Sequence, residues 1–156
     1  GDLAGAPWLA HKASHEGVMV AELISGKQPN PIKKSHISNC TYSQPEIASI
    51  GLTEEQALEH SIRVKVGNFP FIGNGKAVVL GETEGFVKTI FNAETGEFLG
   101  AHMVGPNVTE LISVYAVGLG LEITEEDFAH TIFPHPTLSE AIHESALSAL
   151  ERTIHY

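Results

Sequence analysis

The chain has 156 residues, of which 42% are hydrophobic and 18% are charged, a composition typical of a globular protein with one substantial core. Its formal net charge of −10 argues against a nucleic-acid-binding surface, which would need a basic patch. No apolar run approaches the roughly 20 residues that span a bilayer, and no signal peptide opens the chain, so we expect no membrane partner. Cys40 is the only cysteine, which excludes an internal disulfide and is compatible with a reducing compartment.

The first part of the chain is predicted to be separate from the rest. Residues 8–26 predict a helix, with Pro7 suited to its first turn and Gly26 to its end. Two prolines and three lysines in residues 27–35 indicate a connecting segment. We therefore expect residues 1–35 to form one unit and residues 36–156 to form a compact domain.

Strand signals follow in the next part of the chain. Residues 37–43, 46–52 and 63–68 are strand candidates, and Thr53 with Gln56 predicts a capping box that opens a short helix. Residues 73–76, GNGK, match neither a phosphate-binding loop nor a dinucleotide fingerprint, so we interpret them as a simple loop.

A β-hairpin is the clearest prediction in the middle of the chain. Two apolar, β-prone runs at residues 86–92 and 98–104 are separated by turn residues that include a glycine. Strands with hairpins, followed by helices, predict an α+β domain in which helices pack on an antiparallel sheet.

The segment TELISVYAVGLGLE, residues 109–122, predicts a helix that is apolar on nearly every side. One small sheet covers only one side of such a helix, so a partner chain is expected to cover the other, with Tyr115 as an interface position. Gly118 and Gly120 would allow close approach of a neighbouring backbone. The alternative is a helix buried within one chain. Short helices are then predicted to start at Thr124 and Thr137.

The histidines give no sign of a metal site. His11 and His15 are four residues apart on the predicted first helix, but the HExxH motif is absent, so they are expected to face solvent. His102 and His143 have no assigned partners in the sequence.

The stretch FPHPTLSE, residues 133–140, holds His135 between two prolines, which restrict it to an extended conformation. Thr137 and Glu140 have the spacing of a capping box. Glu140 could equally accept a hydrogen bond from His135 and make that histidine a positioned acid/base. The spacing leaves both interpretations open, and no nucleophile lies nearby in the sequence.

Four motifs, in this order, give the chain a specific resemblance: GDLAGAPWLAHKASHEG, YSQPEIASIGLTEEQA, GAHMVGPNVTELI and HPTLSEAIHE. From residue 1 to the end, the chain resembles the C-terminal third of the dihydrolipoamide dehydrogenases, which are flavin disulfide oxidoreductases. The resemblance implies a homodimer in which this interface domain completes the active site of the other subunit. It further implies that His135 is the acid/base, that Glu140 holds its imidazole, and that the His135–Pro136 bond is cis.

The same resemblance assigns cofactor contacts to the first unit, as the end of a flavin-binding domain. Asp2, which spacing alone presents as a turn residue, would bind the ribityl chain of FAD. The start of the following helix, Trp8-Leu9-Ala10-His11, would point at the flavin ring. The family commonly has methionine where this chain has Trp8, so the contact with the edge of the flavin is expected to differ from the family's usual one.

As implied by the resemblance, the parent enzyme oxidises protein-bound dihydrolipoamide with FAD and a redox disulfide and passes the electrons to NAD. Its partner would be the lipoyl domain of 2-oxoacid dehydrogenase complexes, in the cytoplasm or, in a eukaryote, the mitochondrial matrix. The chain lacks a CxxxxC segment and both nucleotide-binding fingerprints, so alone it is expected to bind no cofactor and to be inactive. The alternatives are a non-enzymatic dimerisation module or the same domain of a glutathione or mercuric reductase, although the latter would carry a C-terminal cysteine pair.

Overall fold

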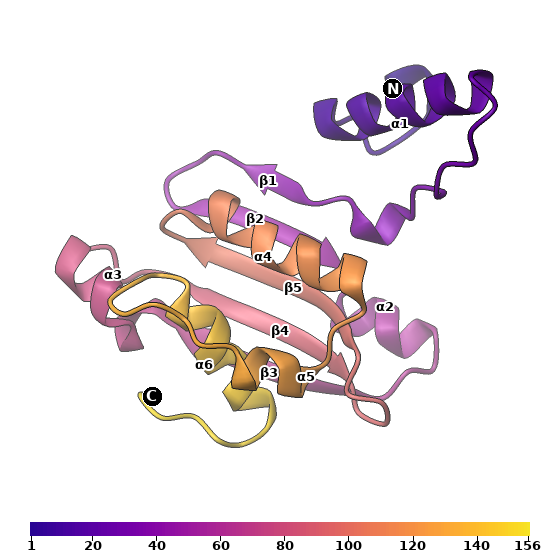
Figure 1. Cartoon of the computed structure of the whole chain (residues 1–156). Helices are drawn as coiled ribbons and strands as arrows, with labels where there is room; N and C mark the ends of the chain where they lie inside the picture. Colours follow the sequence, from indigo (N-terminus) through magenta and orange to yellow (C-terminus); the bar gives the residue numbers. More distant parts are fainter. The chain divides into compact units, whose positions relative to one another are not determined.

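The computed structural model describes all 156 residues, and the chain divides into two compact units, Gly1–Ile37 and Ser38–Tyr156 (Figure 1). The elements of the first unit are η1 (Asp2–Ala4), α1 (Ala10–Ile24) and η2 (Lys34–His36). The predicted helix start was too early: Pro7 follows a cis bond and lies three residues before α1, outside its first turn. Gly26, with φ of 82°, follows the end of the helix as predicted.

The second unit contains a five-stranded sheet in the order β1-β2-β5-β4-β3, with every neighbouring pair antiparallel. The strands are β1 (Asn39–Thr41), β2 (Glu46–Gly51), β3 (Val64–Pro70), β4 (Phe86–Asn92) and β5 (Phe98–Gly105). The helices are α2 (Glu54–Glu59), α3 (Gly75–Leu80), α4 (Val108–Leu121), α5 (Glu125–His130) and α6 (Glu140–Ala149), with η3 (Phe71–Gly73) before α3. The α+β prediction is therefore confirmed, as is the hairpin, which is formed by β4 and β5.

Two helices cover one face of the sheet (Figure 1). The helix α4 packs on β2 and β5, whereas α6 packs on β3 and β4, and α5 lies against α6. The core between these layers contains a cluster of aromatic rings: Phe98 stacks on Tyr115 with ring centroids 5.1 Å apart, and Phe128 meets both rings edge-on or tilted. The sheet and the two helices thus bury a continuous apolar layer, and α6 is the helix that begins with Glu140.

Residues 73–76 are not the simple loop that we predicted. They contain the end of η3 and the start of α3, and Asn74 caps α3 by accepting a hydrogen bond from the N–H of Ala77 at 2.9 Å. The two glycines concealed this short helix because glycine is unfavourable in helices and typical of turns. By contrast, Thr53 and Gln56 form the predicted capping box at α2.

The helix α4 has one buried side and one exposed side. Tyr115 is fully buried, so its prediction as an interface position was wrong. The exposed apolar side chains are Val114, Val117 and Leu121, which are 38%, 62% and 70% exposed. Gly118 makes room for Ile123 of the same chain, whose Cδ1 would lie 2.7 Å from an added Cβ, so it does not serve a neighbouring backbone. Neither α4 nor any other helix is long and apolar enough to cross a membrane.

Candidate functional site

His135 and Glu140 are in direct contact. The Nδ1 atom of His135 lies 2.9 Å from Oε1 of Glu140, and the second carboxylate oxygen accepts a hydrogen bond from the backbone N–H of Thr137 at 2.8 Å. Both oxygens of Glu140 are therefore engaged by the segment that carries the histidine. The carboxylate fixes the ring through one nitrogen, and this leaves Nε2 of His135 as the atom that can exchange a proton with a ligand.

The capping box predicted at Thr137 is only half formed. The helix α6 begins at Glu140, and its N-cap residue is Ser139 rather than Thr137. The hydroxyl of Thr137 donates to the carbonyl of Pro134 at 2.7 Å and shares a hydrogen bond with Ser139, so it does not cap the helix. Glu140 thus reaches back toward a tight turn that includes the cis His135–Pro136 bond implied by the resemblance.

The two members of the pair differ in their exposure. The His135 side chain is 76% exposed, whereas that of Glu140 is 24% exposed. Burial raises the pKa of Glu140, but hydrogen bonds from Thr137 and His135, together with the charges of His135 and His155, hold it below its usual range. At neutral pH the carboxylate is therefore charged, and the imidazole that it orients faces outward from this chain.

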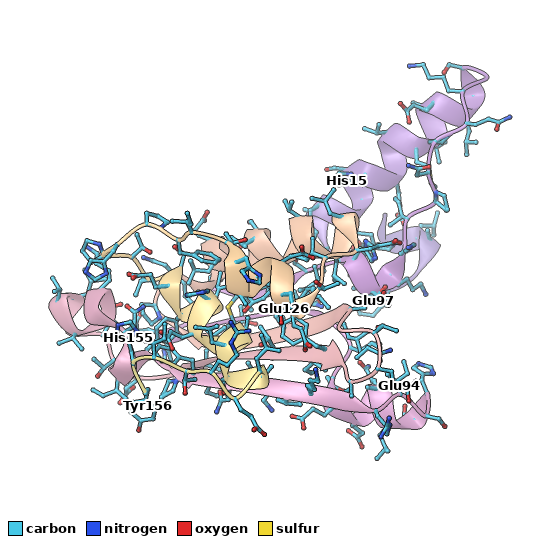
Figure 2. The ribbon with its side chains drawn as sticks, turned by 60° about the horizontal axis from the view of Figure 1, so that its bottom comes forward. His15, Glu94, Glu97, Glu126, His155 and Tyr156 are labelled. Carbon is cyan, nitrogen blue, oxygen red and sulfur yellow. The ribbon has the colours of Figure 1, made fainter.

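The C-terminal tail contributes a second histidine–glutamate pair that we did not predict. Glu144, one helical turn after Glu140, is 4% exposed and accepts from Nδ1 of His155 at 2.6 Å. It also accepts from the backbone N–H of Ile154 at 3.1 Å. Figure 2 shows His155 and Tyr156 on the tail, which folds back toward the domain. The i, i+4 spacing of the glutamates could have suggested their common face, but the partner of Glu144 lies in an irregular tail without a sequence signal.

The first unit holds the residues assigned to cofactor contacts. Asp2 lies in η1 and is exposed, Trp8 is 73% exposed, and α1 begins two residues after Trp8. The N-cap residue Leu9 has no side-chain oxygen to cap α1. An exposed carboxylate can accept hydrogen bonds from hydroxyl groups, and a helix N-terminus without a side-chain cap favours negative charge.

Lys12 is a buried residue of the first unit that the sequence analysis missed. Its side chain is 4% exposed, and Nζ donates to the carbonyl of Gly5 at 2.8 Å and pairs with Glu16 at 2.9 Å. It ties the loop that follows Asp2 to α1. A lysine in an amphipathic helix reads as a solvent-facing residue, so only the packing reveals this contact.

Four other histidines that the sequence analysis considered lie outside the dyad, on α1, β5 and α6. His11 and His15 are exposed on α1, and Figure 2 shows His15 there. No group of three or more histidine, cysteine or acidic side chains could hold a metal ion. His102 contacts the carbonyl of Leu52 at 3.0 Å, and His143 contacts that of Ala129 at 3.0 Å.

Comparison with known proteins shows similarity along the whole chain. The chain is 57% identical over 157 aligned residues to a dihydrolipoyl dehydrogenase of Zymomonas mobilis. The alignment covers 100% of this chain and 34% of that protein. A dihydrolipoyl dehydrogenase of Bacillus subtilis is 47% identical, over 100% of this chain and 33% of its own length. The mitochondrial dihydrolipoyl dehydrogenase of Pisum sativum is 40% identical, over 99% of this chain and 31% of its own length. The chain thus spans about a third of these relatives.

Solved structures share the fold. The crystal structure of LpdA from Mycobacterium tuberculosis matches with a TM-score of 0.83 and 29% identity, over 88% of this chain and 30% of that one. The flavoprotein disulfide reductase RclA of Escherichia coli matches in fold with a TM-score of 0.86 and 23% identity, over 94% of this chain and 34% of that one. Residues 37–146 match the family described as pyridine nucleotide-disulphide oxidoreductase, dimerisation domain. The chain therefore belongs to the dimerisation-domain family of the pyridine nucleotide-disulphide oxidoreductases.

Proposed function

We propose that this chain is part of a dihydrolipoyl dehydrogenase and supplies its acid/base dyad, His135 and Glu140. The observation that carries the proposal is the 2.9 Å contact between Nδ1 of His135 and a carboxylate whose other oxygen is also hydrogen-bonded. A carboxylate that holds one nitrogen of an imidazole raises the basicity of the other nitrogen. The exposed Nε2 of His135 is then suited to a substrate that arrives from outside this chain.

The dyad would act on the thiols of dihydrolipoamide. Nε2 of His135 accepts the proton of one thiol, and the thiolate attacks a sulfur of the redox disulfide, so that one sulfur–sulfur bond forms and another breaks. The charge of Glu140 stabilises the imidazolium that results. Cys40 is the only cysteine of the chain, so the disulfide must come from another part of the protein. This arrangement explains why the histidine has no nucleophile beside it.

The electron pair would pass from the dithiol to FAD and then to NAD, which are the cofactors we propose for the full-length enzyme. We assign residues 1–35 to the end of the flavin-binding domain. There, Asp2 would bind a hydroxyl of the ribityl chain, and the segment Trp8-Leu9-Ala10-His11 would present the N-terminus of α1 to the flavin ring. The absence of a side-chain cap from Leu9 supports this role.

A homodimer would bring the dyad to the active site of the other subunit. The exposed apolar side chains of α4, Val114, Val117 and Leu121, support a contact between two copies, because they form a stripe at helical spacing. The substrate would be the lipoyl group carried by the lipoyl domain of a 2-oxoacid dehydrogenase complex. Such complexes would place the protein in the cytoplasm or, in a eukaryote, in the mitochondrial matrix.

The experiment compares His135→Gln with Glu140→Gln in a full-length dihydrolipoyl dehydrogenase that carries this chain. His135→Gln should lower kcat for dihydrolipoamide by about 10²–10⁴, because it removes the group that moves the proton. Glu140→Gln should cost less, since the amide oxygen can still accept a hydrogen bond from the ring, although the negative charge and the second acceptor oxygen are lost. If neither substitution changes turnover while Glu140→Ala lowers the melting temperature, the stretch is structural and the chain acts only as a dimerisation module.

A further inference from the structure

We propose that Asn74 is a positioning residue for the dyad, an inference that rests on the proposed function. Asn74 lies at the start of α3, far from His135 in the sequence, and is only 3% exposed. Its Nδ2 donates to the backbone carbonyl of Thr137 at 3.1 Å. The N–H of the same Thr137 donates to Glu140, and Glu140 holds His135. Three consecutive hydrogen bonds therefore connect Asn74 with the imidazole.

The turn that carries the dyad is attached to the domain beside Thr137 by two contacts of different kinds. Leu138 is 7% exposed and belongs to the core, so it anchors the turn by apolar packing. This packing restrains distance but not rotation, because apolar contact has no direction. The hydrogen bond from Asn74 has a direction, and it orients the carbonyl of Thr137, the residue whose own N–H, in the preceding peptide group, donates to Glu140.

The alternative role for Asn74 is that of a simple helix cap. Its Oδ1 accepts from the N–H of Ala77 at 2.9 Å, which satisfies one of the unpaired donors at the start of α3. Serine or aspartate would cap a helix about as well, because a cap needs only the side-chain oxygen. Only an amide of this length can also donate to Thr137 from the same position. The hydrogen bond to Thr137, rather than the cap, therefore explains why residue 74 is an asparagine.

The segment before Asn74 is held in place as well. A Cβ added to Gly73 would lie 2.9 Å from Cζ of Phe69 and 3.0 Å from Cβ of Tyr156, so the backbone of Gly73 is packed between these two residues. The rings of Phe69 and Tyr156 meet edge-on with centroids 6.4 Å apart. Asn74 thus follows a backbone segment that packs closely against the buried Phe69, and such packing helps a residue to align a neighbouring turn.

The test uses two variants in a full-length dihydrolipoyl dehydrogenase that carries this chain. Asn74→Ser keeps an uncharged cap and cannot reach Thr137, while Asn74→Asp keeps the shape and the cap but loses the donor. Thr53→Ala is the matched control, since it removes an equivalent cap from α2, where the N–H of Gln56 donates to Thr53 at 3.1 Å. His135→Gln is made in parallel.

We expect both Asn74 variants to lower kcat for dihydrolipoamide on the order of tenfold or more, with little change in KM, because a displaced dyad affects the proton transfer rather than binding. The acid side of the pH profile of kcat should move to lower pH, since a less well held carboxylate stabilises the imidazolium less. Reduction of an artificial dye by NADH, which bypasses the dithiol step, should be unchanged. Thr53→Ala should lower the melting temperature and leave kcat, KM, the pH profile and dye reduction unchanged.

Two results separate the inference from the proposed function. If His135→Gln leaves turnover intact, the proposed function is wrong and the role of Asn74 falls with it. If His135→Gln abolishes turnover but both Asn74 variants keep the kcat and pH profile of the parent, Asn74 is a helix cap only. A parallel loss of dye reduction in the Asn74 variants would likewise overturn the positioning role, because the damage would then be general.

Discussion

Gly67 determines how closely α6 approaches the sheet. It lies in β3, and a Cβ added there would be 1.8 Å from the carbonyl oxygen of Ser145 and 2.9 Å from the backbone nitrogen of Ala149. Both atoms belong to the backbone of α6, so no side-chain rotation can relieve the overlap. Gly67 has no left-handed backbone conformation, and the requirement for glycine is therefore one of space.

The substitution Gly67→Ala should strongly destabilise the domain. Tight Cβ contacts lie at 3.0–3.4 Å, so the Ser145 carbonyl would have to move by about 1.2–1.6 Å. Its hydroxyl would move with it, and this hydroxyl contacts Thr89 at 2.9 Å in the buried layer. Overpacking of this kind costs typically 1–3 kcal/mol, and we expect the upper end, about 3 kcal/mol, because a whole helix must shift. The melting temperature should then fall by roughly 10 °C.

Thermal unfolding of the chain, followed by far-UV circular dichroism, measures this effect. Gly75→Ala is the control, because Gly75 is exposed, has no positive φ and would place its Cβ within 4 Å of nothing. The control should melt within about 2 °C of the parent, as expected of a surface change. A Gly67→Ala chain that also melted within that range would refute the close packing of α6 on β3.

Three further predictions concern the interface, the thiol and the dyad. Val117→Glu should dissociate the proposed dimer without unfolding the domain, because Val117 is 62% exposed, whereas Tyr115→Glu should unfold the domain, because Tyr115 is buried. Sedimentation velocity with circular dichroism distinguishes these outcomes, and a dimeric Val117→Glu chain would argue against α4 as the interface. Burial and two neighbouring glutamates raise the pKa of Cys40, so its alkylation at neutral pH, followed by mass spectrometry, should be slower than that of a cysteine peptide. If Cys40 and the peptide were alkylated at the same rate, the partial burial of the Cys40 thiol would be contradicted. For Glu140, burial raises the pKa, but a backbone N–H and the imidazole of His135 more than offset this, so the folded pKa lies below its usual range. Its contribution to stability is therefore present above the ordinary carboxyl pKa and is lost as the pH falls through the folded value. Urea unfolding of parent and Glu140→Gln chains should differ at neutral pH and converge in acid; a difference that persists in acid would refute this assignment.

Local patterns in the sequence were sufficient for much of the fold. The hairpin of β4 and β5 follows from two β-prone runs around a glycine turn, and the capping box of α2 follows from Thr53 and Gln56. These predictions held because the interactions connect residues close together in the chain. The short helix α3 was missed for the same reason, since its glycines have a local preference for turns that the tertiary contacts override.

By itself the sequence determined the α+β class, the family and the candidate dyad, because the order of the motifs and the position of His135 between two prolines can be read directly from it. It left open whether Glu140 holds His135 or only caps a helix. The tertiary structure decided that Glu140 bonds both His135 and the turn beside it, and that Thr137 does not cap α6. It also decided which side of α4 is exposed and brought Asn74 to Thr137. Asn74 and Thr137 are 63 positions apart, so their contact depends on how the elements pack together. Glu140 and its partners lie within five residues of one another, but the conformation of the turn, which their spacing does not specify, decides what the carboxylate contacts.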